Sequence, residues 1–331
     1  ACLESQLKKF LDFDSGANSA IMVNNYDWFK NFSFLDFIRD VGKHLTVNYM
    51  MAKDSVKKRL EGDTGMSFTE FSYQLVQGYD FYYLWKERNC LVQMGGSDQW
   101  GNMVTGTELI RRIAGGTAFA ITTQLIKKAD GTKFGKTEEG AVWLDPAKTS
   151  PFKFYQFWLN TSDDDAKTWI RIFTLKTEAE IEGLEKEHNE APHLRILQKA
   201  LAEEITTRAH GEAALQTALK TTDFLFGNGS LDFLRELSNE AVLDVFEGIP
   251  QYTVAKSALT TGVSITDLLA EHTAVFPSKG EARKMIQGGG VALNKEKLED
   301  PTQLITTTNL VNDKFLVVQK GKKNYFLLSA K

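Results

Sequence analysis

The sequence predicts an α/β protein with three parts: a parallel-sheet domain, an α-helical domain and a small α+β domain. Apolar runs at residues 20–23, 90–94 and 119–126 are each followed by a polar loop and a helical pattern, which is typical of strands in a parallel sheet. Residues 177–225 have a continuously helical pattern. Residues 264–331 mix short helices with strands, two of them predicted near 314–319 and 324–328.

The domain boundaries follow from these changes of pattern. We assign residues 1–150 to the parallel-sheet domain, 151–245 to the helical domain, and 246–331 to a linker and the small domain, whose core is 264–331. The helical pattern at 5–13 has no start signal. We therefore expect the chain to begin partway through an element, and the parallel-sheet domain to be incomplete at its N-terminus.

Composition excludes several classes of protein. Of 331 residues, 42% are hydrophobic and 25% charged, and the two cysteines are too few for a disulfide framework or a thiolate metal cage. We see neither a secretory signal nor a stretch for a membrane helix, so the cytoplasm is the expected compartment. Net charge is −4, yet residues 279–331 carry about +5. This tail favours an RNA partner, with a solvated basic face as the alternative.

A capped helix carries the first group of candidate site residues. Ser67 and Glu70 have the spacing of a capping box before an aromatic and aliphatic run at 71–85. Polar residues recur within it at i, i+4 and i+7, and so share one helical face. Such a stripe is either a solvated surface or the wall of a pocket. The residues are Tyr73, Gln77 and Asp80.

A glycine-rich turn follows the strand predicted at 91–94. Residues 95–102 read Gly-Gly-Ser-Asp-Gln-Trp-Gly-Asn and open a helix. Strand, glycine turn and helix form a ligand crevice at the carboxyl edge of a sheet. Glycine lets a ligand approach the backbone, and the helix N-terminus favours anions. Asp98 is placed to accept hydrogen bonds from a ribose.

A lysine-rich loop spans residues 127–137. Lys133 and Lys136 lie beside glycines, and Lys127 and Lys128 precede them. Lysines on a mobile loop can follow the charge that develops on the phosphates of a leaving pyrophosphate. A solvated hairpin is the alternative. The loop has no Walker arrangement, which argues against a P-loop kinase.

Together these segments resemble the class I aminoacyl-tRNA synthetases, and in detail the bacterial tyrosyl-tRNA synthetase family. The resemblance covers essentially the whole chain, including the stretches at 24–28, 41–51 and 150–158. Residues 133–137, Lys-Phe-Gly-Lys-Thr, are similar to the family's Lys-Met-Ser-Lys-Ser signature; three positions differ and both lysines remain. The resemblance implies a Rossmann-like catalytic domain, a helical anticodon-binding domain and a small RNA-binding domain.

The resemblance also implies roles for single residues. Asp80 would bind the phenolic hydroxyl of tyrosine, with Tyr73 and Gln77 at its α-amino group. Selection of tyrosine over phenylalanine would then rest on hydrogen bonding. The remaining implied roles are these: Asn25 and Trp28 line the tyrosine pocket, Gln99 lies beside the reacting carboxylate, Asp98 holds the adenylate ribose, Gly96 lets the adenylate pass, and Lys133, Lys136 and Thr137 form the catalytic loop.

The implied substrates are tyrosine, ATP with Mg²⁺, and tRNA(Tyr), with no tightly bound cofactor and no dedicated metal site in the protein. A homodimer without membrane attachment is also implied. In the basic tail, the candidate RNA contacts are Lys279, Arg283 and Lys284, with Lys320, Lys322 and Lys323 as a second cluster.

One feature of the family has no match in this chain. Class I enzymes carry a His-Ile-Gly-His type signature that grips ATP, and the nearest string here, Gly42-Lys43-His44, belongs to a later segment. We therefore expect feeble or absent adenylation from this chain alone. The alternatives are a non-catalytic RNA-binding module and the sister tryptophanyl-tRNA synthetase; Asp80 and the basic tail favour tyrosine.

Overall fold

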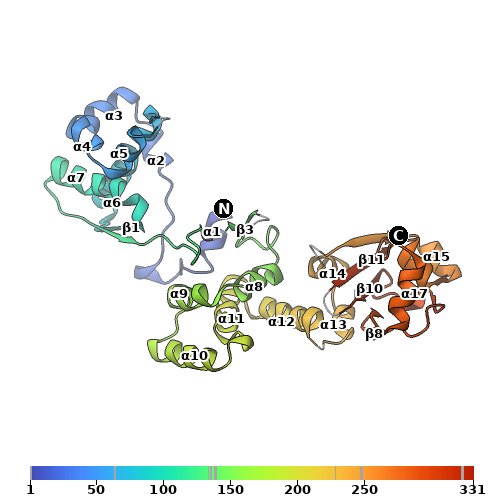
Figure 1. Cartoon of the computed structure of the whole chain (residues 1–331). Helices are drawn as coiled ribbons and strands as arrows, with labels where there is room; N and C mark the ends of the chain where they lie inside the picture. The colour runs from blue at the N-terminus through green and yellow to red at the C-terminus, as the bar shows by residue number, and fades with distance from the viewer. Residues whose placement is uncertain are drawn as a thin grey trace. The chain divides into compact units, whose positions relative to one another are not determined.

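The structure is a computed structural model, which describes residues 2–62, 65–132, 134, 136–137, 140–227, 229–246, 249–321 and 324–331. The chain divides into two compact units (Figure 1). One comprises Asp12–Phe134, and the other Ala1–Leu11 with Gly135–Lys331.

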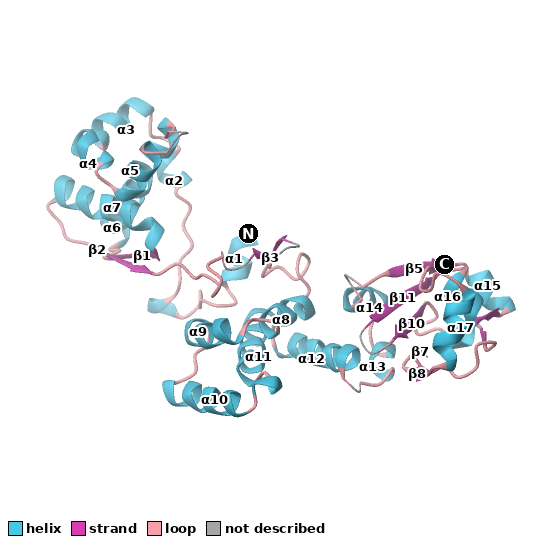
Figure 2. Ribbon diagram, viewed as in Figure 1, coloured by secondary structure: helices cyan, strands magenta, loops and turns pink. Residues whose placement is uncertain are grey.

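The unit Asp12–Phe134 is mainly helical, as Figure 2 shows. Its described residues include one pair of strands. Its elements are η1 (Gly16–Asn18), α2 (Tyr26–Phe29), α3 (Phe34–Asp40), η2 (Gly42–His44), α4 (Val47–Met51), α5 (Asp54–Leu60), α6 (Phe68–Arg88), β1 (Val92–Gly96), η3 (Ser97–Gln99), α7 (Trp100–Ala114) and β2 (Phe119–Thr123). The core contains Val41, Leu45, Met50, Leu75 and Leu109.

The long helix α6 begins where the sequence predicts. The Ser67 hydroxyl accepts a 3.1 Å hydrogen bond from the Glu70 backbone N–H, which confirms the N-cap. The Glu70 carboxylate pairs instead with Arg59, at 2.7 and 3.0 Å. Helices α6 and α7 pack closely at glycines: a Cβ added to Gly106 would lie 2.7 Å from Phe81. This close approach fixes the two helices that carry most of the candidate site.

The predicted parallel sheet is confirmed only in part. Strands β1 and β2 pair in parallel, from Val92 opposite Phe119 to Gly96 opposite Thr123. The strand predicted at 20–23 was wrong, since these residues form a loop in which Ile21 is 71% exposed. A strand needs a neighbour for its backbone hydrogen bonds. Within the described residues the parallel sheet has two strands, and no third strand pairs with 20–23.

The second unit opens with helices. Its first elements are α1 (Cys2–Leu7), the short strands β3 (Lys136–Thr137) and β4 (Gly140–Ala141), α8 (Pro151–Leu159), α9 (Asp163–Phe173), α10 (Glu178–Glu190), η4 (Pro192–Leu194), α11 (Ile196–His210), α12 (Glu212–Phe226), α13 (Asp232–Arg235) and α14 (Asn239–Val245). The helical prediction for 177–225 is confirmed, and Thr177 and Glu180 form a capping box at the start of α10.

The C-terminal part of this unit is an α+β fold, as predicted. It contains β5 (Gln251–Val254), α15 (Lys256–Thr261), β6 (Val263–Ser264), α16 (Ile265–Ala270), α17 (Lys279–Gln287), β7 (Val291–Leu293), β8 (Glu296–Lys297), β9 (Leu304–Ile305), η5 (Thr307–Asn309), β10 (Phe315–Lys320) and β11 (Asn324–Ala330). Five strands form a sheet in the order β5-β11-β10-β7-β8, parallel only between β11 and β5.

This five-stranded sheet is buried on both faces. Leu316 and Val318 of β10 belong to a core that includes residues of α16 and α17. Phe315 and Val317 of the same strand belong to a second core with Phe224 of α12. Because successive strand residues point to opposite faces, β10 joins the small domain to the preceding helices through a shared core.

Candidate active site

Asp80 lies on α6 and is held by two donors from the segment before α3. The Trp28 indole Nε1 donates to Asp80 Oδ1 at 2.8 Å, and Asn25 Nδ2 donates to Asp80 Oδ2 at 3.3 Å. The Trp28 ring stacks on Tyr83, with ring centroids 4.5 Å apart and planes at 17°. The structure therefore brings together three residues that the family resemblance placed around tyrosine. They are Asp80 and, from a distant part of the chain, Asn25 and Trp28.

Burial and hydrogen bonding act in opposite directions on this carboxyl group. Burial raises the pKa of Asp80 and is the larger effect, whereas the hydrogen bonds from Trp28 and Asn25 lower it. Both bonds leave lone pairs on the carboxylate oxygens, so the group can accept a further hydrogen bond. A half-buried acceptor beside aromatic rings suits a ligand with an apolar body and a hydroxyl at its end.

A chain of amides links α6 to the glycine-rich turn. Asn102 Nδ2 donates to Gln77 Oε1 at 3.0 Å and to Gln99 Oε1 at 3.3 Å, and Gln99 Nε2 donates to Asp98 Oδ2 at 3.2 Å. Asn102 thus orients two predicted site residues at once. The sequence motif contained Asn102, but its spacing gave it no role; the bridging contact appears only when α6 and α7 pack together.

Gly96 ends β1 beside Asp98. A Cβ added to Gly96 would lie 2.7 Å from Asp98 Oδ1 and 3.1 Å from Leu125 Cδ2. Any larger residue would therefore displace the Asp98 carboxylate, so this glycine is needed to place Asp98. The predicted reason for Gly96, passage of a ligand, is a separate requirement that stays a prediction.

A pocket of about 490 Å³ adjoins these residues. Tyr73, Asp98 and Gln99 line it, whereas Asn25, Gln77 and Asp80 do not. Its other lining residues come from the segment around α5, from the start of α6 and from α7, and comprise Lys53, Ser55, Val56, Arg59, Met66, Ser67, Thr69, Glu70, Gln74 and Asn102. The predicted site residues thus lie at the pocket and beside it.

Lys53 is a pocket residue that the sequence did not single out. Its ammonium donates to the Gly101 carbonyl and to the Thr105 hydroxyl, and lies 4.9 Å from the centre of the Tyr49 ring. Burial lowers the pKa of Lys53 to about 8, because it penalises the charged form. Lys53 precedes a short helix and belongs to no periodic pattern, so only the fold reveals it.

The catalytic loop can be placed only in part. Lys133 lies outside the described residues. Lys136 and Thr137 form β3, whose backbone pairs in antiparallel fashion with Gly140 and Ala141.

The candidate RNA contacts lie at α17. Lys279 pairs with Asp267 at 2.6 Å and Glu271 at 2.9 Å, whereas Arg283 and Lys284 are exposed on the helix. Of the second cluster, Lys320 approaches Glu281 at 3.6 Å, while Lys322 and Lys323 lie outside the described residues. The positive charge of Lys279 is therefore balanced within the fold.

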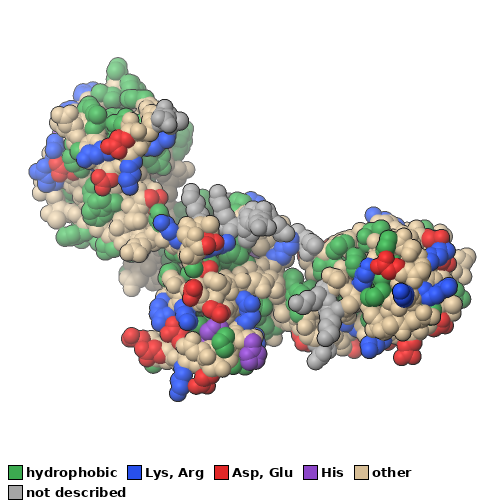
Figure 3. Space-filling model, viewed as in Figure 1, with side chains coloured by type: hydrophobic (Ala, Val, Ile, Leu, Met, Phe, Trp, Pro, Cys, Tyr) green, Lys and Arg blue, Asp and Glu red, His purple; other side chains and the backbone are tan. Residues whose placement is uncertain are grey.

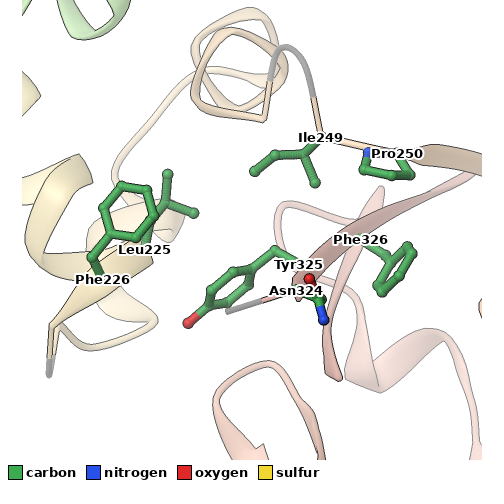
Figure 4. A pocket seen from close by; sticks show the side chains of 7 residues that line it. All are labelled: Leu225, Phe226, Ile249, Pro250, Asn324, Tyr325 and Phe326. Atoms are coloured by element: carbon green, nitrogen blue, oxygen red, sulfur yellow. The ribbon is translucent and has the colours of Figure 1, made fainter. Parts of the chain in front are cut away.

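A smaller pocket of about 240 Å³ lies between the end of α12 and β11. Figure 4 shows Tyr325 extending from β11 toward Leu225 and Phe226, with Phe326 on the other side of the strand. Lys295 donates a 2.6 Å hydrogen bond to the Tyr325 hydroxyl. This pocket shares no residue with the one beside Asp98.

Two family models match the chain. The model described as tRNA synthetases class I (W and Y) matches residues 1–227, and the one described as the tyrosine–tRNA ligase SYY-like C-terminal domain matches residues 241–328.

Individual relatives agree with these models. The chain is 60% identical to a tyrosine–tRNA ligase of Bacteroides fragilis over 334 residues, which cover 100% of this chain and 78% of that protein. It is also 60% identical to a tyrosine–tRNA ligase of Porphyromonas gingivalis, covering 99% and 77%. Among solved structures, a C-terminally truncated mitochondrial tyrosyl-tRNA synthetase of Aspergillus nidulans matches with a TM-score of 0.56 and 30% identity, covering 68% of this chain and 65% of that one.

Proposed function

The chain belongs to the tyrosine–tRNA ligase family of class I tRNA synthetases, and on that premise we propose roles for its residues in activating tyrosine and charging tRNA(Tyr). The observation that carries the proposal is the environment of Asp80. Its carboxylate accepts hydrogen bonds from Trp28 and Asn25 and retains acceptor capacity.

Tyrosine binds with its phenolic hydroxyl donating to Asp80. Phenylalanine offers no donor there and would leave a half-buried carboxylate with an unmet acceptor, which penalises its binding. Tyr73 and Gln77 hold the α-amino group. Asn102 supports this assignment because it fixes the orientation of Gln77. Gln99, tied to the same amide, lies beside the carboxylate of the substrate.

ATP binds on the Asp98 side of the turn. Asp98 accepts hydrogen bonds from the ribose, and Gly96 leaves room for the adenylate. Lys133 and Lys136 neutralise charge on the β and γ phosphates, with Thr137 in the same loop. Mg²⁺ accompanies ATP on its phosphates.

Two steps complete the reaction. A carboxylate oxygen of tyrosine attacks the α-phosphorus of ATP, and the bond to the β-phosphate bridging oxygen breaks as pyrophosphate leaves with the electron pair. A terminal hydroxyl of tRNA(Tyr) then forms an ester with the tyrosyl carbonyl carbon; AMP leaves with the electrons of the carbon–oxygen bond, and the hydroxyl proton passes to water. Positioning and electrostatics supply the catalysis, without a covalent enzyme intermediate.

The tRNA meets the chain at three domains with the boundaries 1–150, 151–245 and 246–331. The helical domain binds the anticodon, and the small domain contacts the RNA backbone through α17. Arg283 and Lys284 support this assignment by their exposure. Lys279 contributes once the phosphate competes with Asp267 and Glu271 for its ammonium.

The active protein is a cytoplasmic homodimer. Helix α3 supports this, because Phe34, Leu35 and Ile38 are 65%, 78% and 43% exposed while Phe37 packs against Tyr79. Figure 3 shows hydrophobic side chains at the surface where Figure 1 places α3. A contact between copies would bury such an apolar surface. No described helix has the length and apolar character needed to span a bilayer. A Leu35→Glu protein that remains dimeric by sedimentation would count against this interface.

The proposal is tested first by measuring tyrosine binding by calorimetry in wild type, Asp80→Ala and Asp27→Ala proteins. Asp27 is the matched control, an exposed carboxylate beside Trp28 that pairs with Lys30 at 3.4 Å. We expect Asp80→Ala to weaken tyrosine binding by at least about tenfold and Asp27→Ala to leave it unchanged. Equal loss in both variants, or none in Asp80→Ala, would reject the role of Asp80.

Catalysis is then followed by tyrosine-dependent exchange of labelled pyrophosphate into ATP and by charging of tRNA(Tyr). Lys133→Ala should slow exchange far more than it weakens tyrosine binding, since its role belongs to the transition state. Because feeble adenylation is expected of this chain alone, exchange is measured beside a version extended at its N-terminus. Absence of exchange in both versions, with RNA binding intact, would favour the alternative of a non-catalytic module.

A further inference from the structure

The two-residue turn between β7 and β8 carries a lysine at a position that favours glycine. Leu293 pairs with Glu296, so Asn294 and Lys295 form the whole turn, and their φ angles are 51° and 69°. Both residues are in the left-handed region, as in the type I′ turns that prefer Asn-Gly. Asparagine tolerates this backbone, whereas a long side chain is disfavoured there. A lysine held in this conformation indicates a side-chain contact that glycine could not make.

Asn294 fixes the turn to the five-stranded sheet. Its backbone N–H donates to the Val317 carbonyl at 2.7 Å, and its side-chain Oδ1 accepts from the Val317 N–H at 2.9 Å. Its Nδ2 donates to the Asn309 carbonyl at 2.6 Å. These bonds hold the turn against β10, and so they fix the backbone of Lys295 within the small domain.

The Lys295 side chain reaches from this turn to α12. Its ammonium lies 4.7 Å from the centre of the Phe224 ring on α12 and 4.8 Å from the centre of the Tyr325 ring on β11. It also donates a 2.6 Å hydrogen bond to the Tyr325 hydroxyl. Phe224 and Tyr325 are buried. Because a partly desolvated ammonium is attracted to the faces of aromatic rings, Lys295 links the turn to the helix and to the neighbouring strand.

This link differs in kind from the apolar core around it. Phe224 and Tyr325 both belong to the core that α12 shares with the five-stranded sheet. Apolar burial holds two surfaces together but is non-directional, so it determines the angle between them only loosely. A hydrogen bond and a cation above a ring depend on direction as well as distance. The contacts of Lys295 therefore restrict the angle between α12 and the sheet.

We propose that Lys295 is a positioning residue, which sets the orientation of the small domain on α12 and thereby holds α17 where a tRNA can contact both. The inference rests on the proposed function, in which α17 contacts the RNA backbone. Two binding surfaces in a fixed geometry bind one ligand more tightly than two loosely joined ones, because less freedom is lost on binding. Lys295 acts through α17 and contacts no RNA itself.

The orientation is tested by the distance between spin labels on α12 and on the small domain. The labels are attached at Ala213→Cys and Glu299→Cys, both exposed positions, after the native thiols are removed by Cys2→Ser and Cys90→Ser. Unchanged Lys295 should give one narrow distance distribution. Lys295→Gly should broaden it about twofold, and should not impair folding because glycine suits the turn. Lys295→Arg keeps the cation and the donor and should restore the narrow distribution.

Lys297→Met is the matched control, since Lys297 is an exposed lysine on β8 of the same hairpin. It should leave the distance distribution unchanged. A distribution as narrow in Lys295→Gly as in wild type would overturn the inference and leave the proposed function intact.

Binding of a tRNA(Tyr) transcript at several salt concentrations separates positioning from direct contact. Lys295→Gly should weaken binding about fivefold and keep the wild-type slope of log Kd against log salt, since α17 still reaches the same phosphates. A slope reduced by about one would assign Lys295 to a phosphate and overturn the positioning role, as would unchanged affinity. Wild type that binds no transcript would overturn the proposed function, while the spin-label distances would still decide whether Lys295 orients the small domain.

Discussion

The indole Nε1 of Trp28 donates a 2.8 Å hydrogen bond to Oδ1 of Asp80, which ties the short helix α2 to the middle of α6. Trp28 also stacks on Tyr83, so the ring is fixed from its face and from its edge. The bond opposes the effect of burial on the Asp80 carboxyl. Trp28 therefore orients Asp80 and limits the rise of its pKa.

Trp28→Phe should preserve the stack on Tyr83 and remove the hydrogen bond. The pKa of Asp80 then rises further, since a group that lowers it is gone. Tyrosine affinity should fall by roughly tenfold, and more at pH 5 than at pH 8, because protonated Asp80 is a poorer acceptor. Calorimetric titrations at the two pH values measure this. Wild-type affinity at both would show that Trp28 does not act through Asp80.

Lys53 should give the fold a pH dependence in the alkaline range. Its folded pKa of about 8 lies below its unfolded value of 10.5, so the unfolded chain binds more protons between these values, and stability rises with pH across the window. Lys53→Met removes that rise. Urea unfolding of both proteins at pH 7.5 and pH 10 measures this rise in stability. The neighbouring Tyr49, whose ring faces Lys53, loses its proton at higher pH than a free tyrosine because burial raises its pKa. Parallel slopes in the two proteins would exclude a perturbed Lys53.

Two helical glycines should respond in opposite directions to alanine. A Cβ on Gly106 meets Phe81 at 2.7 Å, so Gly106→Ala should destabilise the unit by about 1–3 kcal/mol despite the better helix propensity of alanine. Gly183 in α10 has no atom within 4 Å of such a Cβ, and Gly183→Ala should stabilise by about 0.5–1 kcal/mol. Midpoints of urea unfolding compare them. A neutral Gly106→Ala would mean that α6 and α7 can separate at little cost.

Asn312 should couple the small domain to α13. Its Nδ2 donates to the carbonyls of Leu234 at 3.0 Å and Leu237 at 2.9 Å. Asn312→Asp tolerates the same positive φ but replaces the donor with a charged acceptor, and should cost about 1–3 kcal/mol.

The neighbouring Asp313→Asn is the control for this prediction, because Asp313 has an equally positive φ and makes only an exposed ion pair with Lys256, whose loss costs less than about 1 kcal/mol. Thermal unfolding of the two proteins separates the effects. Equal midpoints would show that the contact to α13 contributes nothing.

Helices and their starts were predictable because their hydrogen bonds are local. Short-range patterns predict the Ser67 cap and the helical region from Thr177 onward. They also predict the strands 315–320 and 324–330. The strand predicted at 20–23 failed for the opposite reason: apolar composition alone does not supply the neighbour that a strand requires.

The sequence by itself determined the helical regions, the glycine turn and the set of residues that resemble a tyrosine site. Only the tertiary structure decided that Trp28 and Asn25 meet Asp80, that Asn102 bridges Gln77 to Gln99, and that Lys53 is half-buried beside neutral partners. These contacts join segments that no period in the sequence relates. The contact of Asn102 with Gln77 forms because the close packing of α6 on α7 at their glycines brings the two side chains within hydrogen-bonding distance.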